Sequence, residues 1–182
     1  IQSLLVPRNP IFCFILFRAT MWLLLLFEVS MGISNLTGLL LLSSFEGDMQ
    51  DDTYMPNLLS GSVVYIYADD DDGVKGVVLN KPFLPEAKVI VSGLDIELDD
   101  KQEANFKSEL YLGGSSGLSR VSVVYSAESD DEVKFSSAKK TVRSCLLESY
   151  HLDHLFLIGE SSWQPGDIYH EISNGWWHVV PT

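Results

Sequence analysis

Regular alternation of hydrophobic and polar residues begins only after an apolar N-terminal stretch. Residues 11–27 (IFCFILFRATMWLLLLF) are almost wholly apolar, whereas apolar and polar positions alternate from residue 36 onward. Such alternation indicates strands and helices that bury one face against a core. The pattern therefore predicts one domain over residues 36–182, behind a segment, residues 1–35, that does not belong to its core.

Strand patterns dominate the domain. Residues 61–68 (GSVVYIYA), rich in β-branched and aromatic residues, are the strongest strand signal. Residues 69–73 then turn the chain and residues 74–79 return it, which predicts a hairpin with a five-residue acidic tip. Further strands are predicted over residues 36–42, 109–112, 121–126, 155–158 and 176–180. The first of these is apolar enough to be covered on both faces.

Two helices complete the prediction. Residues 138–150 carry Val142, Cys145, Leu146 and Tyr150 at helical spacing. Pro165 at a helix start and Gly175 just beyond its end predict a second helix. The chain is therefore expected to be a single α+β domain without an internal repeat.

Three interpretations of residues 1–35 stay open. Arg8 gives a signal peptide its basic start, but Arg18 interrupts the apolar run. A membrane anchor needs about 20 apolar residues, and a central arginine is costly in it. Because the chain begins at Ile1, we favour a fragment or a misassigned start over a signal or anchor, and both over genuine core. The expected location is cytoplasmic or organellar, with membrane contact only if residues 1–35 act as an anchor.

The charge of the chain argues against nucleic-acid binding. Twelve basic and 25 acidic residues give a net charge of −13, and the densest cationic group is Lys139-Lys140 with Arg143. Proteins bind DNA and RNA largely by neutralising phosphates with lysine and arginine, so a domain this acidic would repel a duplex. The two cysteines do not indicate a disulfide framework, and Cys145 is interpreted as a small buried hydrophobic residue.

Possible catalytic patterns are weak. Residues 113–117 (GGSSG) match the G-x-S-x-G pattern of serine hydrolases, but that motif needs a following helix and a strand is predicted here. The same glycines could cradle a phosphate, although no Walker lysine follows. The acidic run at residues 69–72 lacks EF-hand spacing and is interpreted as a solvated tip. His151 and His154, three apart near a predicted helix end, would need a third metal ligand.

A group of aromatic residues surrounds the second predicted helix. It comprises Trp163, Tyr169, Trp176 and Trp177. Large aromatics at such spacing most often pack in a core. A face that binds a ligand or partner is the alternative.

Four blocks of residues between Leu36 and Pro181 carry a family resemblance. They are Leu36-Thr37-Gly38 with the apolar run after it; Ser62 to Ile66 with Gly73, Gly76 and Asn80-Lys81-Pro82; Leu112-Gly113-Gly114 with Arg120; and Gly159, Trp163, Gly166, Glu171, Asn174, Trp176 and Pro181. Together they resemble the AlgH/YqgE family, a bacterial and plant group often labelled as transcriptional regulators. The resemblance implies a mixed β-sheet, partly barrel-like, with flanking helices, in an α+β (α/β) fold. It implies no established activity.

The chain also departs from the family pattern. The acidic run at residues 69–72 replaces a Glu-His step, and Tyr125 stands where a family histidine is expected. Chemistry that relies on those histidines would be lost here. The family usually continues past Pro181, so the domain is expected to be truncated at that end.

These observations favour a non-enzymatic binding or regulatory domain that acts through protein or small-ligand contacts. Glycine leaves backbone room, Asn80 offers a donor and an acceptor, and tryptophan offers apolar area. The candidate ligand-binding residues are Asn80, Gly113, Gly114, Arg120 and Trp163. No catalytic residue, metal ligand or cofactor is assigned. The alternative is a metal-dependent hydrolase that uses carboxylates with His151, His154 or His170.

Overall fold

The structure is a computed structural model that describes residues 33–44, 59–83, 100, 110–127, 130–147 and 152–182. The interpretations of residues 1–32, of Cys13 and of His151 lie outside these residues. The strands are β1 (Leu39–Ser43), β2 (Val63–Asp70), β3 (Gly73–Val78), β4 (Leu110–Leu112), β5 (Ser116–Ala127), β6 (Asp130–Ser136), β7 (Leu152–Trp163) and β8 (Trp177–Pro181). The helices are α4 (Lys139–Leu147) and α5 (Asp167–Ser173).

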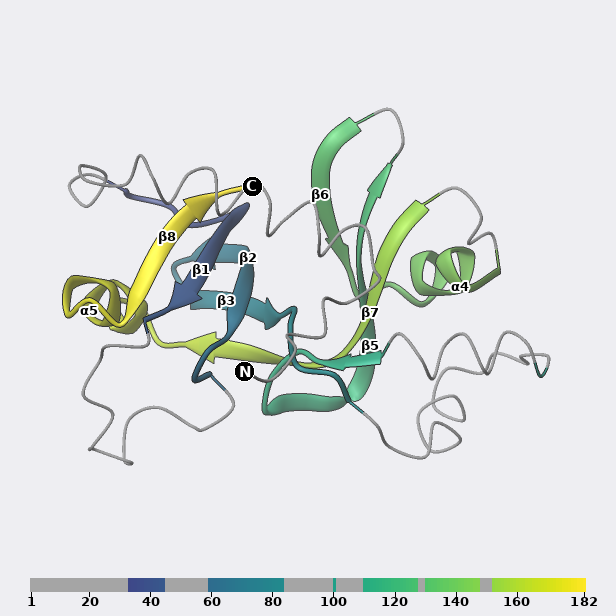
Figure 1. Ribbon diagram of the computed structural model, residues 1–182, viewed down its shortest axis with the longest axis horizontal. Coiled ribbons are helices and arrows are strands. Elements are labelled where there is room, and N and C mark those ends of the chain that lie inside the picture. The colour runs from purple at the N-terminus through teal and green to yellow at the C-terminus, as the bar shows by residue number, and fades with distance from the viewer. Residues whose placement is uncertain (1–32, 45–58, 84–99, 101–109, 128–129, 148–151) are drawn as a thin grey trace, which may run out of the picture.

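The strands form one mixed, strongly curved sheet. Its order is β6-β5-β7-β3-β2-β1-β8, and β4 is added in parallel to β7 while all other pairs are antiparallel. In Figure 1, β7 runs from the group that contains β5 and β6 to the group that contains β1, β2, β3 and β8. The described part of the chain is thus a strand-dominated half-barrel with two helices, which agrees with the mixed, partly barrel-like sheet that was expected.

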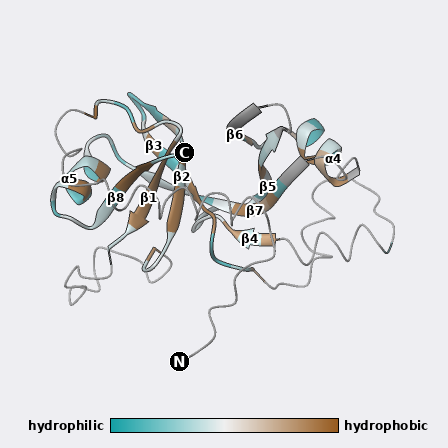
Figure 2. Ribbon diagram, turned by 45° about the horizontal axis from the view of Figure 1, so that its top comes forward, coloured by the Kyte–Doolittle hydropathy of each residue, from teal (hydrophilic) through white to brown (hydrophobic). Residues whose placement is uncertain are grey.

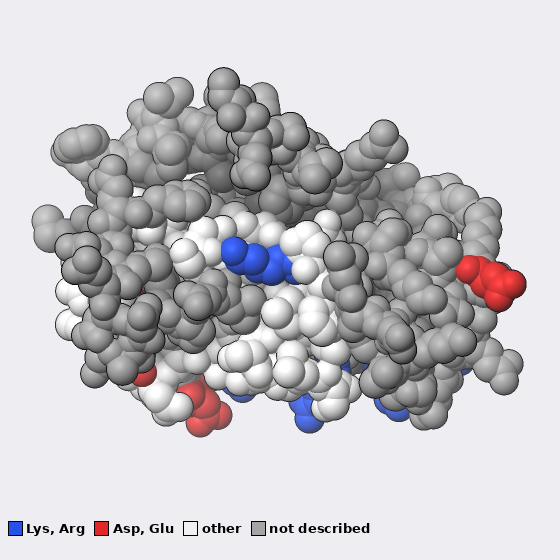
Figure 3. All heavy atoms as spheres, turned by 60° about the horizontal axis from the view of Figure 1, so that its bottom comes forward, with Lys and Arg blue, Asp and Glu red and all other residues white. Residues whose placement is uncertain are grey.

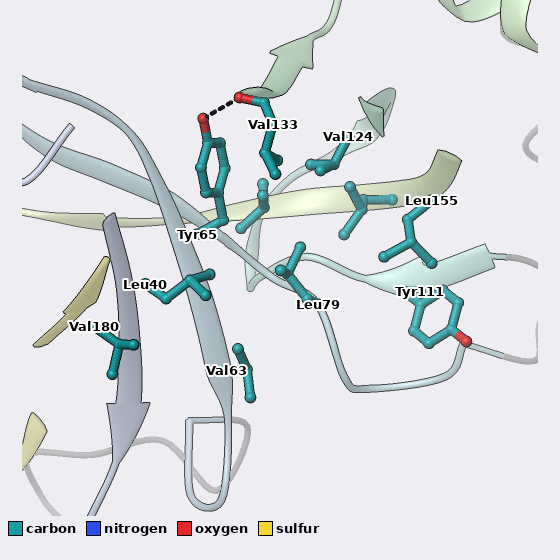
Figure 4. Close-up of a cluster of buried hydrophobic side chains, with 11 residues drawn as sticks. Leu40, Val63, Tyr65, Leu79, Tyr111, Val124, Val133, Leu155 and Val180 are labelled. Atoms are coloured by element: carbon teal, nitrogen blue, oxygen red, sulfur yellow. Dashed lines mark hydrogen bonds between the residues drawn. The ribbon is translucent and has the colours of Figure 1, made fainter. Parts of the chain in front are cut away.

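The concave side of the half-barrel is filled by side chains from every strand (Figure 4). The Tyr65 hydroxyl on β2 donates a hydrogen bond of 2.9 Å to the carbonyl of Val133 on β6. Because β2 and β6 are not neighbours in the sheet, this bond ties its two halves together across the interior. The buried members of this cluster are Leu40, Val63, Tyr65, Val77, Leu79, Tyr111, Val124, Val133, Leu155, Leu157 and Val180.

The opposite faces of the strands are covered by the two helices. On β2, Val63 and Tyr65 point into the concave core, whereas Val64 and Ile66 belong to a second cluster under α5. Successive strand residues point to opposite faces, so one strand can serve both clusters. A third cluster lies under α4 and includes Cys145, which is 2% exposed, as interpreted from the sequence. In Figure 2, hydrophobic colour marks much of β1, β2 and β8, the strands on the side of the sheet that carries α5.

Most predicted elements are present, with shifted ends. Leu40 and Leu41 of β1 are buried in different clusters, which confirms that this strand is covered on both faces. The predicted five-residue hairpin tip is wrong: β2 continues to Asp70 and β3 begins at Gly73, so two residues form the turn. Gly73 has a φ of 117°, which glycine adopts without strain.

The Asp69 carboxylate, near the end of β2, is engaged within the fold. It accepts hydrogen bonds from the backbone N–H of Leu36 at 2.7 Å and from the Tyr169 hydroxyl at 2.5 Å. The side chain therefore links β2 to α5 and to the residues before β1. Asp69 is a structural residue, and only the remainder of the acidic run matches the solvated tip that was expected.

One further boundary corrects the predictions. The helix predicted over residues 138–150 is present as α4, and residues 148–150 lie outside the described residues. β7 spans 12 residues where only residues 155–158 were predicted. His154 consequently lies in a strand and not at a helix end. It is buried, with its ring edge-on to that of Phe156 at 4.8 Å between centroids. In the part of the chain that is described, no helix has the length and apolarity needed to cross a membrane.

Candidate functional site

Three of the five sequence-predicted site residues converge where β7 bends. Gly113 and Gly114 follow β4, and Arg120 lies in β5, which pairs with β7. The bend is at Gly159, whose φ is 79°. Asn80 and Trp163 lie elsewhere in the fold. We refer to Gly113, Gly114 and Gly159 as the glycine junction.

At the glycine junction, two backbones approach more closely than side chains would allow. A Cβ on Gly114 would lie 2.0 Å from the carbonyl carbon of Glu160, and one on Gly113 would lie 2.4 Å from the Gly159 oxygen. Gly113 donates its N–H to Ile158 at 2.7 Å and accepts one from Val78 at 2.8 Å. Thus β7 itself occupies the room that was assigned to a ligand, and the junction fixes β4 and β5 on β7.

Beside the junction, Glu160 anchors a half-buried polar group. Its carboxylate accepts a hydrogen bond of 2.5 Å from the Tyr67 hydroxyl on β2. The ring of Tyr67 stacks on Phe135 of β6, with centroids 3.9 Å apart and planes 9° apart. Burial and this hydrogen bond raise the pKa of Tyr67 far above 10.0, and the charge of nearby Arg120 opposes part of the rise. The Tyr67 hydroxyl is consequently neutral and acts as a donor at physiological pH.

The first part of β5 projects from the sheet next to this group. Ser116 is paired with Glu160 and Val121 with Ile158, so four residues of β5 face a single residue of β7. Gly117, with a φ of 65°, begins the departure. Every residue from Ser115 to Arg120 is exposed, and Leu118 is the exposed large hydrophobic residue of the described chain, at 50%. We call residues 115–120 the β5 projection.

The hydrolase-like GGSSG motif runs into a strand and not into a helix. In α/β-hydrolases the G-x-S-x-G serine lies on a turn from a strand into a helix. Here a strand follows the motif, as the sequence pattern indicated, and Ser116 itself already belongs to that strand, β5. The GGSSG sequence therefore serves the glycine junction and the projection, and does not form a nucleophile elbow.

The predicted site residue Asn80 is engaged within the fold. Its amide nitrogen donates to the carbonyl of Gly61 at 2.8 Å, and its amide oxygen accepts from the N–H of Val63 at 3.0 Å. The neighbouring Lys81 ammonium donates to the carbonyl of Ser60 at 2.7 Å. Asn80 and Lys81 thereby hold the turn before β2 against the end of β3.

The predicted site residue Trp163 is 8% exposed and lies in the core under α5. Its indole N–H donates to Glu171 at 3.2 Å, and that of Trp177 donates to the same carboxylate oxygen at 2.6 Å. Burial raises the pKa of Glu171 above its ordinary 4.5, although the bonds from Trp177 and Trp163 oppose this. The arrangement matches the packing interpretation of the aromatic group.

The residues that metal chemistry would need are dispersed in the described chain. No group of three or more histidine, cysteine, aspartate or glutamate residues is close enough there to hold a metal ion. The buried His154 packs on Phe156, and the exposed His170 ring contacts the Asn174 amide at 3.1 Å. Asp70 accepts from the backbone N–H of Asp72 at 2.9 Å, within its own turn.

Sequence reasoning missed Tyr67 and Glu160. Tyr67 belongs to the same alternating face as Tyr65, and its polar end gave no local signal of a partner 93 residues away. Glu160 follows Gly159, and a glycine with a charged residue directly after it, at the end of the apolar run Leu155 to Ile158, is the signal that could have identified it. Leu118 lies between the strands predicted over residues 109–112 and 121–126, outside any predicted element.

Comparisons with known proteins agree on one family. Residues 45–182 match a family model described as AlgH-like. A UPF0301 protein of Coxiella burnetii is 28% identical over 122 residues, which is 66% of this chain and 66% of that protein. The match therefore spans just under two thirds of that relative. A UPF0301 protein of Desulfotalea psychrophila is 27% identical over 159 residues, or 81% of this chain and 77% of the relative.

Two solved structures share the fold. The solution structure of the AlgH protein from Pseudomonas aeruginosa superposes with a TM-score of 0.62 at 19% identity, over 83% of this chain and 79% of that one. A crystal structure of a protein from Corynebacterium diphtheriae gives a TM-score of 0.53, also at 19% identity, over 80% and 75%. Likeness at this identity concerns the fold alone.

Proposed function

We propose, from the premise that this chain belongs to the AlgH-like family, that it is a non-enzymatic binding domain that acts through contacts with a protein chain. The names of these relatives state no activity. The proposal therefore depends on the surface of this chain. It places the contact at the β5 projection, where the predicted site residue Arg120 stands beside Leu118.

The observation that carries the proposal is the exposure of Leu118. Its side chain is 50% exposed within six consecutive exposed residues, while residues 155–158 of the neighbouring strand β7 are buried. Burying a leucine fully contributes roughly 1.5–3 kcal/mol relative to leaving it in water. A single exposed leucine is ordinary, but this one lies on a projecting strand segment whose backbone is also accessible.

The surroundings of Leu118 suit a protein partner. The β5 projection contains no acidic residue and carries the cation Arg120, in a chain of net charge −13. Figure 3 shows the face seen when the lower side of Figure 1, where β5 begins, comes forward. There basic side chains lie among neutral ones, and acidic side chains lie toward the rim. An apolar residue with a polar and cationic rim is typical of protein contacts.

The glycine junction supports the projection mechanically. Gly114 lies against the backbone of Glu160, the residue that pairs with Ser116 at the start of the projection. Both ends of the exposed segment are therefore fixed to β7. A surface held in one conformation loses less entropy when it binds than a flexible loop does.

No observation favours the metal-dependent hydrolase. Such an enzyme needs three protein ligands around one ion, and the described histidines and carboxylates do not converge in that way. The concave interior, the usual place for a substrate pocket in such a fold, is packed with side chains from all eight strands.

A capture experiment tests the proposal. The wild-type chain and Leu118→Ser are immobilised at equal density and exposed to lysate from the source organism, and bound proteins are identified by quantitative mass spectrometry. Gln164→Ser, at another exposed position, is the matched control. We expect wild type and control to retain the same specific proteins and Leu118→Ser to lose most of them. Equal retention by all three would remove the β5 projection as the binding surface.

A further inference from the structure

We infer that Asn174 is a site of slow self-modification, at which the backbone nitrogen of Gly175 displaces the side-chain amide nitrogen with assistance from His170. This inference goes beyond the proposed function and concerns the connection between α5 and β8 (Figure 1). It draws on three features: the residue types at the step, its exposure at a helix end, and the ring nitrogen that lies beside the amide.

The residue types supply both reacting groups. Asn174 and Gly175 form the one Asn-Gly step of the chain. Asparagine is chemically labile, because the backbone nitrogen of the next residue can reach the carbon of its side-chain amide within the same chain. When the next residue is glycine, no Cβ shields that nitrogen. The dipeptide therefore contains an electrophile and an unhindered nucleophile.

The step lies at an exposed helix end. Asn174 is the C-cap of α5, with φ −82° and ψ 0°, and both Asn174 and Gly175 are exposed. The Gly175 N–H donates to the carbonyl of Ile172 at 2.9 Å, so this bond must open and ψ must change before the nitrogen can attack. Helix ends open locally at little cost in free energy, and α5 has only 7 residues. The closed cap should therefore slow the reaction without preventing it.

A ring nitrogen lies beside the amide group that must leave. The Nε2 atom of His170 is 3.1 Å from the Nδ2 atom of Asn174. The two residues are four apart, so the helix places them on one face. Imidazole is the side-chain group that most often acts as a general acid or base, and this distance is within its reach. His170 is therefore placed to transfer a proton to the leaving nitrogen.

The reaction needs water as its only co-reactant. The Gly175 nitrogen forms a bond to the Cγ atom of Asn174 and gives up its proton. The bond between Cγ and Nδ2 breaks, and the leaving nitrogen receives a proton through His170 and departs as ammonia. The product is a cyclic imide, and water opens it at either carbonyl. Position 174 then carries an aspartate or an isoaspartate.

Either product should weaken the end of α5. An aspartate adds a negative charge at the C-terminus of the helix, where the helix dipole disfavours it. An isoaspartate places an extra methylene group in the main chain between α5 and β8. The backbone N–H of Trp176 donates to the carbonyl of Glu171 at 3.0 Å, and this bond depends on the unmodified chain path. Modified chains should therefore unfold at lower urea concentrations than unmodified ones.

Ageing of the full chain tests the site. The chain is incubated at neutral pH and physiological temperature, and mass spectrometry follows the gain in mass that accompanies exchange of the amide nitrogen for oxygen at each asparagine. Asn35, which is exposed and followed by Leu36, is the internal control. We expect Asn174 to convert at least about tenfold faster than Asn35, because no Cβ hinders the attack. An unconverted Asn174, under conditions that convert a synthetic peptide of residues 170–178, would overturn the inference.

Gly175→Ala separates the chemistry from the stability of the cap. Alanine is strained at a φ of 75°, so the cap of this variant should open more often. Its Cβ shields the attacking nitrogen, however, and we expect conversion to be at least about tenfold slower than in the wild type. A variant that converts as fast as the wild type would contradict attack by the nitrogen of residue 175.

His170→Asn tests the assistance. Histidine and asparagine have similar helix propensities, so the opening of the cap should change little. In the folded state we expect the wild type to convert at least about threefold faster than His170→Asn. In urea the helix is lost, and the two chains should convert at the same rate. Equal rates in the folded state, or a difference that persists in urea, would overturn the role given to His170.

Discussion

The indoles of Trp163 and Trp177 meet edge to face, with centroids 6.2 Å apart and planes at 86°, and both donate to one oxygen of Glu171. Trp163 ends β7, Trp177 begins β8, and Glu171 lies on α5 between them. One half-buried carboxylate thus connects three elements. It also fixes the aromatic group in the core, which is why that group is not part of the proposed binding surface.

Removing this carboxylate should destabilise the fold. Glu171→Ala leaves two indole N–H groups without their acceptor, and we expect the free energy of unfolding to fall by about 2–4 kcal/mol. Glu171→Gln keeps a neutral hydrogen-bond acceptor, so its free energy of unfolding should fall less than that of Glu171→Ala. Urea denaturation followed by far-UV circular dichroism measures both. The control is Asp167→Asn, at an exposed position on the same helix, which should lower the free energy of unfolding by only about 0.5 kcal/mol. If this control lost as much stability as Glu171→Ala, the effect would belong to α5 in general and not to the bonds of Glu171.

The raised pKa of Glu171 predicts a specific pH dependence. A carboxyl whose pKa is higher in the folded than in the unfolded state binds its proton more readily in the folded state. The folded state is therefore favoured as pH falls from neutral toward the folded-state pKa, which lies above 4.5. The difference in unfolding free energy between wild type and Glu171→Gln should shift in favour of wild type over this range. A difference that does not change with pH would contradict the raised pKa.

The glycine junction predicts a contrast between two glycine substitutions. Gly114→Ala places a Cβ 2.0 Å from the backbone of Glu160, so we expect a loss of roughly 3 kcal/mol or more. Gly175→Ala, at a φ of 75° with open space around it, should cost only about 1–2 kcal/mol of backbone strain. Chemical denaturation compares the two. If Gly114→Ala lowered the free energy of unfolding less than Gly175→Ala, the close approach of β7 would not be the reason that position 114 needs a glycine.

Much of the sheet is predictable from the sequence, because each strand carries its own alternation. The segment GSVVYIYA shows both faces of β2 directly, and the prediction of a hairpin followed from it. β6 was missed because Val133 and Phe135 are its only apolar residues among seven. Its position depends on long-range contacts, such as that of Phe135 with Tyr67, and no local pattern shows these.

The candidate site was harder to predict than the fold. Gly113 and Gly114 were correctly singled out as positions that need backbone room, but the sequence could not show that β7, more than 40 residues later, fills that room. Asn80 was correctly seen as both donor and acceptor, yet its partners are backbone groups of residues 61 and 63. Residue type indicates the interaction that a side chain can make, whereas only the fold identifies the partner.

Two tyrosines should resist ionisation in the folded protein. Burial, with a hydrogen bond to Asp69, raises the pKa of Tyr169 to about 12. Burial, with a hydrogen bond to Glu160, raises the pKa of Tyr67 even further above 10.0. In a rapid alkaline titration followed by tyrosinate absorbance, these two residues should ionise only well above pH 10.0. Tyr67→Phe and Tyr169→Phe should each remove part of this late absorbance change.

The same shifts predict a loss of stability at high pH. Between the ordinary tyrosine pKa of 10.0 and the folded-state values, the unfolded chain releases protons that the folded chain keeps. The unfolded state is therefore favoured as pH rises through this range. Each Phe variant lacks one such proton, so its unfolding free energy should decline less steeply with pH than that of the wild type. Identical slopes would show that neither hydroxyl is held by its carboxylate.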